Sequence, residues 1–247
     1  MNKKDEIRNQ VWNKLSQEKL GRFPFPLVNR IPNFKGAEAA ARYITEMEQY
    51  KRANVIKVNP DSPQLPLRTQ ILKDGKMLLV PTPRLKKGFI QVKPEWVPKG
   101  EERKAASLSS IMKYGRVLPL SQMPEIDLIV VGSVAIHPDG RRLGKGEGYA
   151  DREYAIIREL GNNEVPIITS IQSAQLVEED IPVDVYDLTV DWIATEKGLI
   201  KTNSPYPKPT GIVWSEVSKE DMEAMPVLKE IKEWISKQLV TKPVKVL

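Results

Sequence analysis

The chain has 247 residues, a formal net charge of +6 and no cysteine, which excludes disulfides, thiolate nucleophiles and cysteine zinc sites. Its single histidine, His137, excludes a multi-histidine metal centre. No apolar run is long enough to span a bilayer, and the charged first ten residues lack the apolar core of a secretory signal, so we expect a cytoplasmic protein. The basic charges are interspersed and only 6% of residues are aromatic, so the composition does not predict a nucleic-acid surface.

The first element in chain order is an amphipathic helix over residues 3–19, with Ile7, Val11 and Leu15 on one face. Prolines exclude regular structure over residues 23–32. Helices and strands then alternate: helix 37–50, strand 55–58, helix 67–73, strand 77–81, helix 107–114, strand 127–131, helix 149–160, strand 165–171, and short strands 192–195 and 198–200. We expect an exposed loop over 94–102. The alternation predicts an α/β fold with a mostly parallel sheet.

The last part of the chain begins with a polar, proline-rich connector at residues 203–210. Beyond it, Ser218 and Asp221 have the spacing of a capping box, and Pro226 suits the first turn of a following helix. Leu228, Ile231 and Ile235 would give that helix an apolar face. We therefore expect an α/β domain over residues 1–202 and a helical extension over 203–247 that packs on it.

The segment 141–151, RRLGKGEGYAD, has glycines at every second position between a buried strand and a helix. Such glycines let successive backbone N–H groups approach a ligand, and a helix N-terminus behind them favours an anion. Arg141, Arg142 and Lys145 add positive charge, so the segment predicts a triphosphate site. The alternative is a flexible loop with solvated charges. The spacing fits neither the dinucleotide fingerprint nor the P-loop.

The stretch from Gly132 to Asp151 resembles the signature of 5-formyltetrahydrofolate cyclo-ligases, also called methenyltetrahydrofolate synthetases, whose pattern includes G-x-R-L-G-x-G-x-G-Y-Y-D. The half from Gly140 onward matches closely. Residues 181–196, IPVDVYDLTVDWIATE, are similar to a second passage of that family, and the K-x-x-x-R spacing of its first helix is present at residues 4–8. The resemblance extends to about residue 200.

The resemblance implies a three-layer α/β fold, with helices flanking the sheet, of the kind found in ribose-5-phosphate isomerases and CoA-transferases. It implies an ATP- and Mg²⁺-dependent ligase that forms 5,10-methenyltetrahydrofolate from 5-formyltetrahydrofolate, or acts on a related formylated pterin. In that family ATP phosphorylates the formyl oxygen, N10 closes the ring, and phosphate leaves. The implied partner is a folate-like small molecule, and no oligomeric state follows from the sequence.

The resemblance also implies roles for individual residues. Arg142 and Lys145 would be the catalytic cations, Asn59 and Tyr149 would contact the substrate, and Asp151 and Asp187 would bind Mg²⁺. The ATP phosphates would lie on the first helix and the glycine loop, at Lys4, Arg8, Arg142, Leu143, Gly144, Lys145, Gly146, Glu147, Gly148 and Tyr149.

The residues themselves leave other roles open for four of these positions. Asp151 also suits the first turn of a helix, where a negative charge complements the helix dipole. Asp187 also suits a loop cap. Lys4 and Arg8, spaced one helical turn apart, also suit a solvated surface.

Two departures from the family pattern bear on the substrate. The family has a glutamate in an E-x-x-T stretch after its first main strand, where this chain has residues 59–64, NPDSPQ. The tyrosine pair has become Tyr149-Ala150. The nucleotide half is thus retained and the pterin half altered, as in a divergent, synthetase-domain-containing branch. This predicts nucleotide binding with weak or no turnover of 5-formyltetrahydrofolate. The alternative is a non-catalytic or RNA-associated paralogue that keeps the fold.

Overall fold

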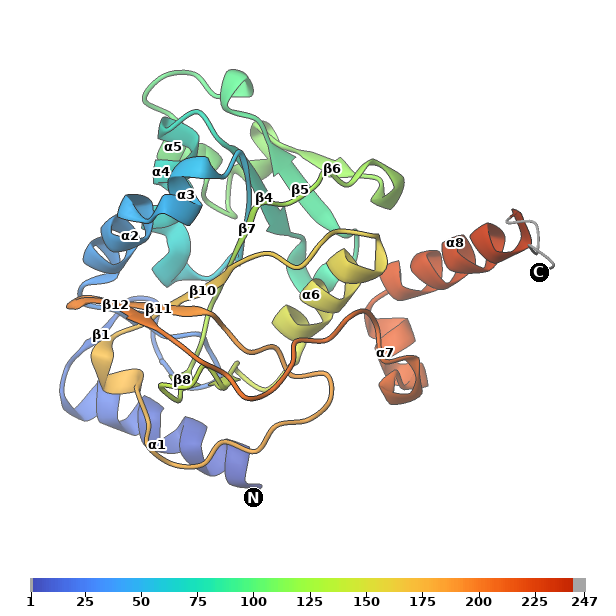
Figure 1. Cartoon of the computed structure of the whole chain (residues 1–247). Helices are drawn as coiled ribbons and strands as arrows, with labels where there is room; N and C mark the ends of the chain where they lie inside the picture. The colour runs from blue at the N-terminus through green and yellow to red at the C-terminus, as the bar shows by residue number, and fades with distance from the viewer. Residues whose placement is uncertain (1, 242–247) are drawn as a thin grey trace.

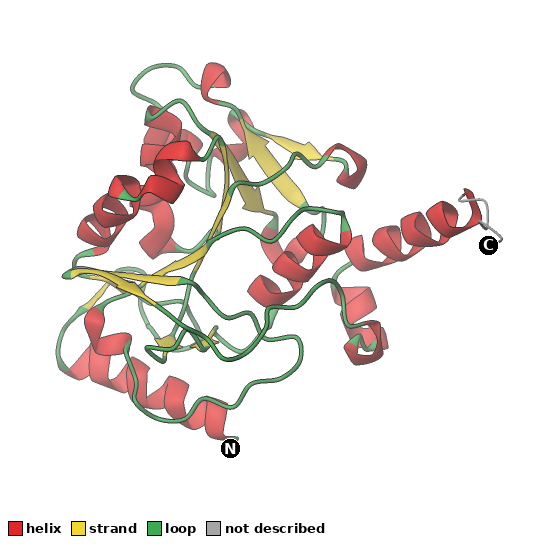
Figure 2. Cartoon of the chain, viewed as in Figure 1, coloured by secondary structure: helices red, strands yellow, loops and turns green. Residues whose placement is uncertain are grey.

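The computed structural model describes residues 2–241, and its centre is one eight-stranded sheet (Figures 1 and 2). The strands of this sheet are β3 (Val55–Val58), β4 (Met77–Pro81), β5 (Phe89–Val92), β6 (Arg116–Leu118), β7 (Leu128–Val131), β10 (Ile167–Ser170), β11 (Trp192–Thr195) and β12 (Gly198–Lys201). Their order is β12-β11-β10-β7-β3-β4-β5-β6. The five neighbouring strands β11, β10, β7, β3 and β4 run parallel to one another, while β12, β5 and β6 each pair antiparallel with a neighbour. The predicted α/β class is confirmed.

Helices cover both faces of the sheet, which makes three layers (Figure 1). The helices are α1 (Lys3–Gln17), α2 (Ala37–Glu46), α3 (Glu48–Arg52), α4 (Leu65–Lys73), α5 (Glu102–Ala105), α6 (Tyr149–Glu159), α7 (Lys219–Ala224) and α8 (Val227–Thr241). One buried cluster joins α2 to α5 with alternate strand residues such as Ile56 and Val130. A second joins α6 and the start of α8 with the opposite set, such as Leu79 and Ile129. Successive strand residues point to opposite faces, so each strand except β12 contributes to both clusters.

Helix α1 lies outside these layers, against the segment that leads into the glycine loop. Its buried face, which includes Ile7, Val11 and Leu15, forms a third cluster with Val134 and Leu143. These belong to a two-stranded sheet of β8 (Ala135–Ile136) and β9 (Arg142–Leu143) and its flank. The remaining small sheet pairs β1 (Gly21–Arg22) with β2 (Asn33–Phe34). The predicted apolar face of the first helix is confirmed.

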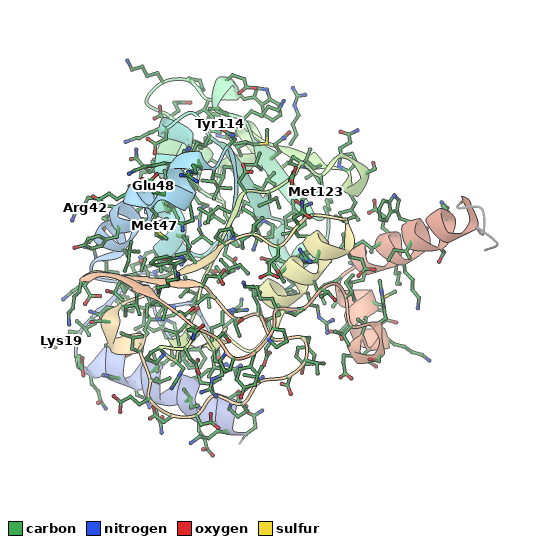
Figure 3. All side chains as sticks on the ribbon, viewed as in Figure 1. Lys19, Arg42, Met47, Glu48, Tyr114 and Met123 are labelled. Carbon is green, nitrogen blue, oxygen red and sulfur yellow. The ribbon has the colours of Figure 1, made fainter. Side chains whose placement is uncertain are left out.

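Three local expectations were wrong. The helix expected over 37–50 is divided into α2 and α3 at Met47, whose backbone is extended (φ −69°, ψ 143°) (Figure 3). The Met47 side chain is buried in the α2–α5 cluster, so tertiary packing overrides helix propensity there. Residues 107–114 contain only a 3₁₀ turn, Ile111–Lys113, and the helix of this region is α5. A 3₁₀ turn, Pro94–Trp96, also interrupts the expected loop.

Residues beyond β12 pack on α6 up to the middle of α8, which then projects from the body (Figure 1). Met225, Leu228 and Ile231 are buried, and Ile235 packs against the same cluster. Both hydrogen bonds of the predicted Ser218–Asp221 capping box form at the start of α7. Residues 242–247 of the expected extension lie outside the described residues. None of the described helices is long and apolar enough to cross a membrane.

Candidate functional site

The candidate site lies where the strand order reverses direction. After β3 the chain adds β4 on one side, and later it adds β7 on the other side, followed by β10 and β11. In open parallel sheets, such a switch point leaves a crevice at the carboxyl ends of the strands. The loop after β3 begins at Asn59, and the segment after β7 begins at Gly132. Both face the same cavity.

Two cavities meet at the glycine loop. The β3 cavity, of about 570 Å³, is lined by the proline-rich segment around Pro24 and Ile31, the loop after β3 and the loop after β4. The α1 cavity, of about 460 Å³, is lined by α1, residues 184–187 and part of the segment beyond β12. Five residues line both cavities: Arg142, Gly144, Glu147, Gly148 and Asp151. The loop is therefore a shared wall, with one face toward each cavity.

The backbone of the loop requires its glycines. Gly146 and Gly148 have φ values of +105° and +67°, which residues with a side chain rarely adopt. Gly148 is the N-cap of α6 and offers no side chain to the first helical turn. The first amides of a helix have no intrahelical partner, so they remain available to an anion at this point. The predicted anion site at the start of the helix thus has the required backbone geometry.

Helix α1 holds the glycine loop in place. Arg8 donates from Nε to the carbonyl oxygen of Gly144 at 2.8 Å, and its Nη1 pairs with Asp5 at 2.6 Å. Lys4 Nζ bridges Asp184 at 2.7 Å and Asp187 at 2.6 Å. These carboxylates help to raise the pKa of Lys4, against the opposing effect of its burial. Both cations line the α1 cavity, so the structure brings the start of the chain to the loop, as the expected phosphate role requires.

Arg142 and Asp151 form a buried ion pair at the junction of the cavities. Nη2 of Arg142 donates to Asp151 Oδ1 at 2.5 Å, and only 1% of the arginine side chain is exposed. The same oxygen accepts the backbone N–H of Leu188 at 2.9 Å. Within the described residues, Nε of Arg142 has no hydrogen-bond partner. A buried guanidinium donor without a partner is costly, and an anionic ligand at the loop would relieve that cost.

The other expected loop residues differ in exposure, since Lys145 and Glu147 are partly open to solvent and Leu143 is not. Lys145 pairs with Glu147 at 2.6 Å, and both side chains face the β3 cavity. Tyr149, expected at the substrate, lines the β3 cavity as well. Leu143 is buried and lines the α1 cavity. The expected residues thus divide between the cavities, with Lys4, Arg8 and Leu143 in one and Lys145 and Tyr149 in the other.

A second buried ion pair lies beneath the β3 cavity. Lys57 is paired in register with Leu79 and Ile129, so it points to the face of the sheet that α6 covers. There its Nζ donates to a carboxylate oxygen of Glu153 and, at 2.8 Å, to Oδ1 of Asn59. Only 1% of Lys57 and 3% of Glu153 is exposed. Burial raises the pKa of the Glu153 carboxyl, and the neighbouring ammonium of Lys57 opposes that effect.

Asp61 places a further carboxylate in the β3 cavity. Burial raises the pKa of Asp61, although the cations Arg68, Lys145 and Lys57 act in the opposite direction. Arg68 is buried and donates to the carbonyl oxygens of Asn59 and Asp61, at 2.6 Å and 2.9 Å, which fixes the course of this loop. Asn59, expected to contact the substrate, lines the cavity and accepts the bond from Lys57.

A family model described as the 5-formyltetrahydrofolate cyclo-ligase family matches residues 1–196. The chain belongs to this family. It is 42% identical over 236 residues to a methenyltetrahydrofolate synthase domain-containing protein of Bos taurus, and 40% identical over 236 residues to that of Homo sapiens. Each alignment covers 93% of the chain, but the chain spans only 62% and 61% of the lengths of these relatives.

The fold agrees with that of a solved family structure. The solution structure of Aquifex aeolicus 5,10-methenyltetrahydrofolate synthetase superposes with a TM-score of 0.51 at 21% identity, covering 83% of this chain and 95% of that one. At this identity the likeness concerns the fold alone. It agrees with the predicted three-layer arrangement of a mostly parallel sheet between helices.

The two expected magnesium ligands could supply part of the coordination shell of a Mg²⁺ ion, with phosphate oxygens supplying the rest. Asp151 and Asp187 both line the α1 cavity and offer the hard carboxylate oxygens that Mg²⁺ prefers. Each uses one oxygen for the contacts given above, to Arg142 and to Lys4. No group of three or more potential metal-ligating side chains occurs among residues 2–241. The remaining ligands would therefore come from water and phosphate oxygens.

Sequence reasoning missed Glu153 in the wall of the β3 cavity. Residues 59–64 contain no glutamate, and a compensating carboxylate was sought at Glu95 or Glu147. Of these two only Glu147 lines the cavity, together with Asp61 and Glu153. One signal was present in the sequence. Lys57 interrupts the apolar strand Val55–Val58, and a lysine in a buried strand needs an anionic partner. The partner lies 96 residues away, so only the packing of α6 on the sheet reveals it.

Proposed function

We propose that this protein is an ATP-dependent ligase that activates the formyl group of a reduced pterin, or of a closely related formylated small molecule. The nucleotide would occupy the α1 cavity and the formylated substrate the β3 cavity. The reaction would transfer the γ-phosphoryl group to the formyl oxygen. A substrate nitrogen would then bond to the formyl carbon as the carbon–oxygen bond breaks and phosphate leaves.

The observation that carries this proposal is the shared wall between the cavities. Phosphoryl transfer needs the acceptor oxygen next to the γ-phosphate and in line with its leaving oxygen. Ligands in the two cavities could meet in this way at the glycine loop, because the loop lines both cavities. The chemistry requires positioning and charge neutralisation more than a protein nucleophile. A chain with no cysteine and one histidine meets that requirement.

Each part of the loop has a role in this proposal. The loop amides and the first turn of α6 would bind phosphate oxygens. Lys145, which faces the β3 cavity, would neutralise charge that develops on the transferred group. Arg142 would contribute through its Nε, which has no hydrogen-bond partner within residues 2–241, while its pairing with Asp151 holds the guanidinium in place.

The cation requirement follows from the same residues. Asp151 and Asp187 would hold Mg²⁺, which supplies charge neutralisation of the nucleotide phosphates when it is bound. The ion pairs to Arg142 and Lys4 orient the two carboxylates before any ligand arrives.

The β3 cavity, where the substrate would bind, has polar side chains in its wall. Asp61 and Glu153 offer acceptors for N–H donors of a pterin-like ring, with Tyr149 and Ile31 on the same cavity wall. Glu153, which comes from α6, supplies the glutamate that the altered loop after β3 lacks in sequence. The rate of turnover of 5-formyltetrahydrofolate therefore depends on whether the carboxylates of Asp61 and Glu153 reach the pterin ring.

The direct test is formation of the methenyl product from 5-formyltetrahydrofolate, followed by absorbance with and without ATP and Mg²⁺. We expect weak turnover that requires both ATP and Mg²⁺. Lys145→Ala should lower kcat/KM by about 10²-fold, the usual effect of removing one group that stabilises developing charge. Lys197→Ala, an exposed lysine that lines neither cavity, is the matched control and should leave the rate unchanged.

The outcomes separate the two readings of the sequence. Binding of an ATP analogue without turnover of any formylated pterin would favour the non-catalytic paralogue. Absence of binding at millimolar nucleotide with Mg²⁺ would contradict the proposed function altogether.

A further inference from the structure

The segment beyond β12 is fixed against α6 by polar contacts as well as by its buried side chains. Glu159, in the last turn of α6, accepts the backbone N–H of Ile212 at 2.8 Å. Arg152, in the middle of α6, pairs with Asp221 at 2.6 Å. Because the glycine loop leads directly into α6, these contacts fix residues 212–221 relative to the loop.

This segment also lines the α1 cavity. Ile212, Val213, Glu216 and Leu228 contribute to its wall, although the match to the family model ends at residue 196. Most other lining residues are charged or belong to the glycine loop. Ile212, Val213 and Leu228 of this segment supply apolar side chains to the wall, together with Leu143, Ala155 and the ring of Tyr186. The cavity thus combines an anion-binding part with an apolar part.

A nucleotide has the matching chemistry, with anionic phosphates at one end and a flat apolar base at the other. We propose that Ile212 and Val213 form the wall that contacts the base and ribose of a nucleotide whose phosphates lie on the glycine loop. This rests on the proposed nucleotide site and adds a specific function for the segment beyond the family match. That segment completes the nucleotide site in addition to packing on α6.

The polarity of the wall supports a base rather than a second anionic group. A phosphate placed against Ile212 and Val213 would lose hydration without gaining a donor, and Glu216 on the same wall would repel it. A purine or pyrimidine ring gains from apolar contact there. The ligand class is therefore a nucleoside triphosphate or diphosphate rather than a polyphosphate alone.

The test compares a nucleotide with the same phosphates lacking a base. Affinities of a non-hydrolysable ATP analogue and of inorganic tripolyphosphate are measured by calorimetry with Mg²⁺, on the full chain. Val213→Gln and the double variant Ile212→Ala, Val213→Ala both alter the wall without changing charge. We expect each to weaken the ATP analogue about tenfold or more, which is about 1.4 kcal/mol, with tripolyphosphate changed less than twofold.

The controls fix the interpretation. Ser215→Gln changes an exposed neighbour that does not line the cavity and should alter neither affinity. Arg8→Gln should weaken both ligands, because it removes a positive charge from the wall of the α1 cavity beside the loop. Melting curves confirm that each variant is folded, and the single Val213→Gln variant, at a partly exposed position, serves if the double variant is not.

Two results would overturn the inference. One is equal weakening of both ligands, or of neither, by the wall variants. The other is a wild-type protein that binds tripolyphosphate as tightly as the ATP analogue. In either case the proposed phosphate site would stand. If the wild-type protein binds neither ligand, both the proposed nucleotide site and this inference fail, so the two failures are distinguishable.

Discussion

Replacing Lys57 by methionine removes one half of the ion pair beneath the β3 cavity and leaves Glu153 buried without its cation. Both side chains are almost fully excluded from solvent, at 1% and 3% exposure. Breaking a buried pair by removing one partner typically costs about 3–5 kcal/mol, because an uncompensated charge stays in the interior. For a chain of this size, that corresponds to a fall in Tm of about 6–20 °C.

The assay is urea unfolding followed by the fluorescence of the five tryptophans. Lys51→Met is the matched control, because Lys51 pairs with Glu48 at 2.8 Å on the surface, with 56% and 67% exposure. Exposed pairs contribute about 0–1 kcal/mol, so this control should be nearly silent. The double variant Lys57→Met, Glu153→Leu should recover most of the loss, since it removes the second charge as well.

Two results would refute this reasoning. A cost below about 1 kcal/mol for Lys57→Met would mean that water or a rearranged partner compensates Glu153. A double variant no more stable than Lys57→Met would mean that the loss comes from packing rather than from an uncompensated charge.

Three further predictions concern single positions. Tyr154→Phe should be neutral or slightly stabilising in urea unfolding, because the buried hydroxyl has no hydrogen-bond partner within the described residues. Burial raises the pKa of Tyr154 to about 12, so wild-type stability should fall as the pH rises from about 10 through 12, and Tyr154→Phe should lose less over that range. Gly140→Ala should lower the free energy of unfolding by about 3 kcal/mol or more, because φ is +103° and a Cβ would lie 2.4 Å from the carbonyl oxygen of Val190. Gly148→Ala, with φ of +67° and open space around the Cβ, should lower it by only about 1 kcal/mol. Equal losses for the two variants would contradict the steric argument. Asp151→Asn should raise the Mg²⁺ concentration needed for nucleotide binding, measured by calorimetry. It should also lower Tm, because Arg142 loses its counter-charge. An unchanged Mg²⁺ dependence would show that Asp151 does not bind the metal.

The sequence predicts the layers of this fold better than it predicts the site. The apolar run 127–131 and the alternation around it identify the parallel strands, because burial on both faces leaves a clear pattern. The strand Phe89–Val92, which lies between β4 and β6, was not predicted, although all four residues are buried, since it lies in the sequence between a lysine-rich turn and a proline-rich segment. Glycine spacing locates the loop that lines both cavities, because the backbone conformation itself demands glycine at residues 146 and 148.

What sequence reasoning could not supply is the pairing of distant charges. Asp151 was expected at a metal, and nothing in the chain indicates that Arg142 is its buried partner. Lys57 and Glu153 meet because the register of β3 points Lys57 toward the face of the sheet on which α6 packs. The β3 cavity and the α1 cavity could not be predicted from a sequence pattern either, because their walls come from loops that follow different strands.

The contacts of α1 have a consequence for the order in which the molecule is made. Lys4 binds Asp187 and Arg8 binds Gly144, contacts that span 183 and 136 residues. The wall of the α1 cavity is complete only at Leu228. At a synthesis rate of about 5–20 residues per second, the first helix emerges tens of seconds before the last part of that wall. During this interval the apolar face of α1 has few of its partners, so the nascent chain presents an amphipathic helix to chaperones. The α1 cavity is therefore complete only after the chain has been made through Leu228, and no shorter precursor has the whole wall.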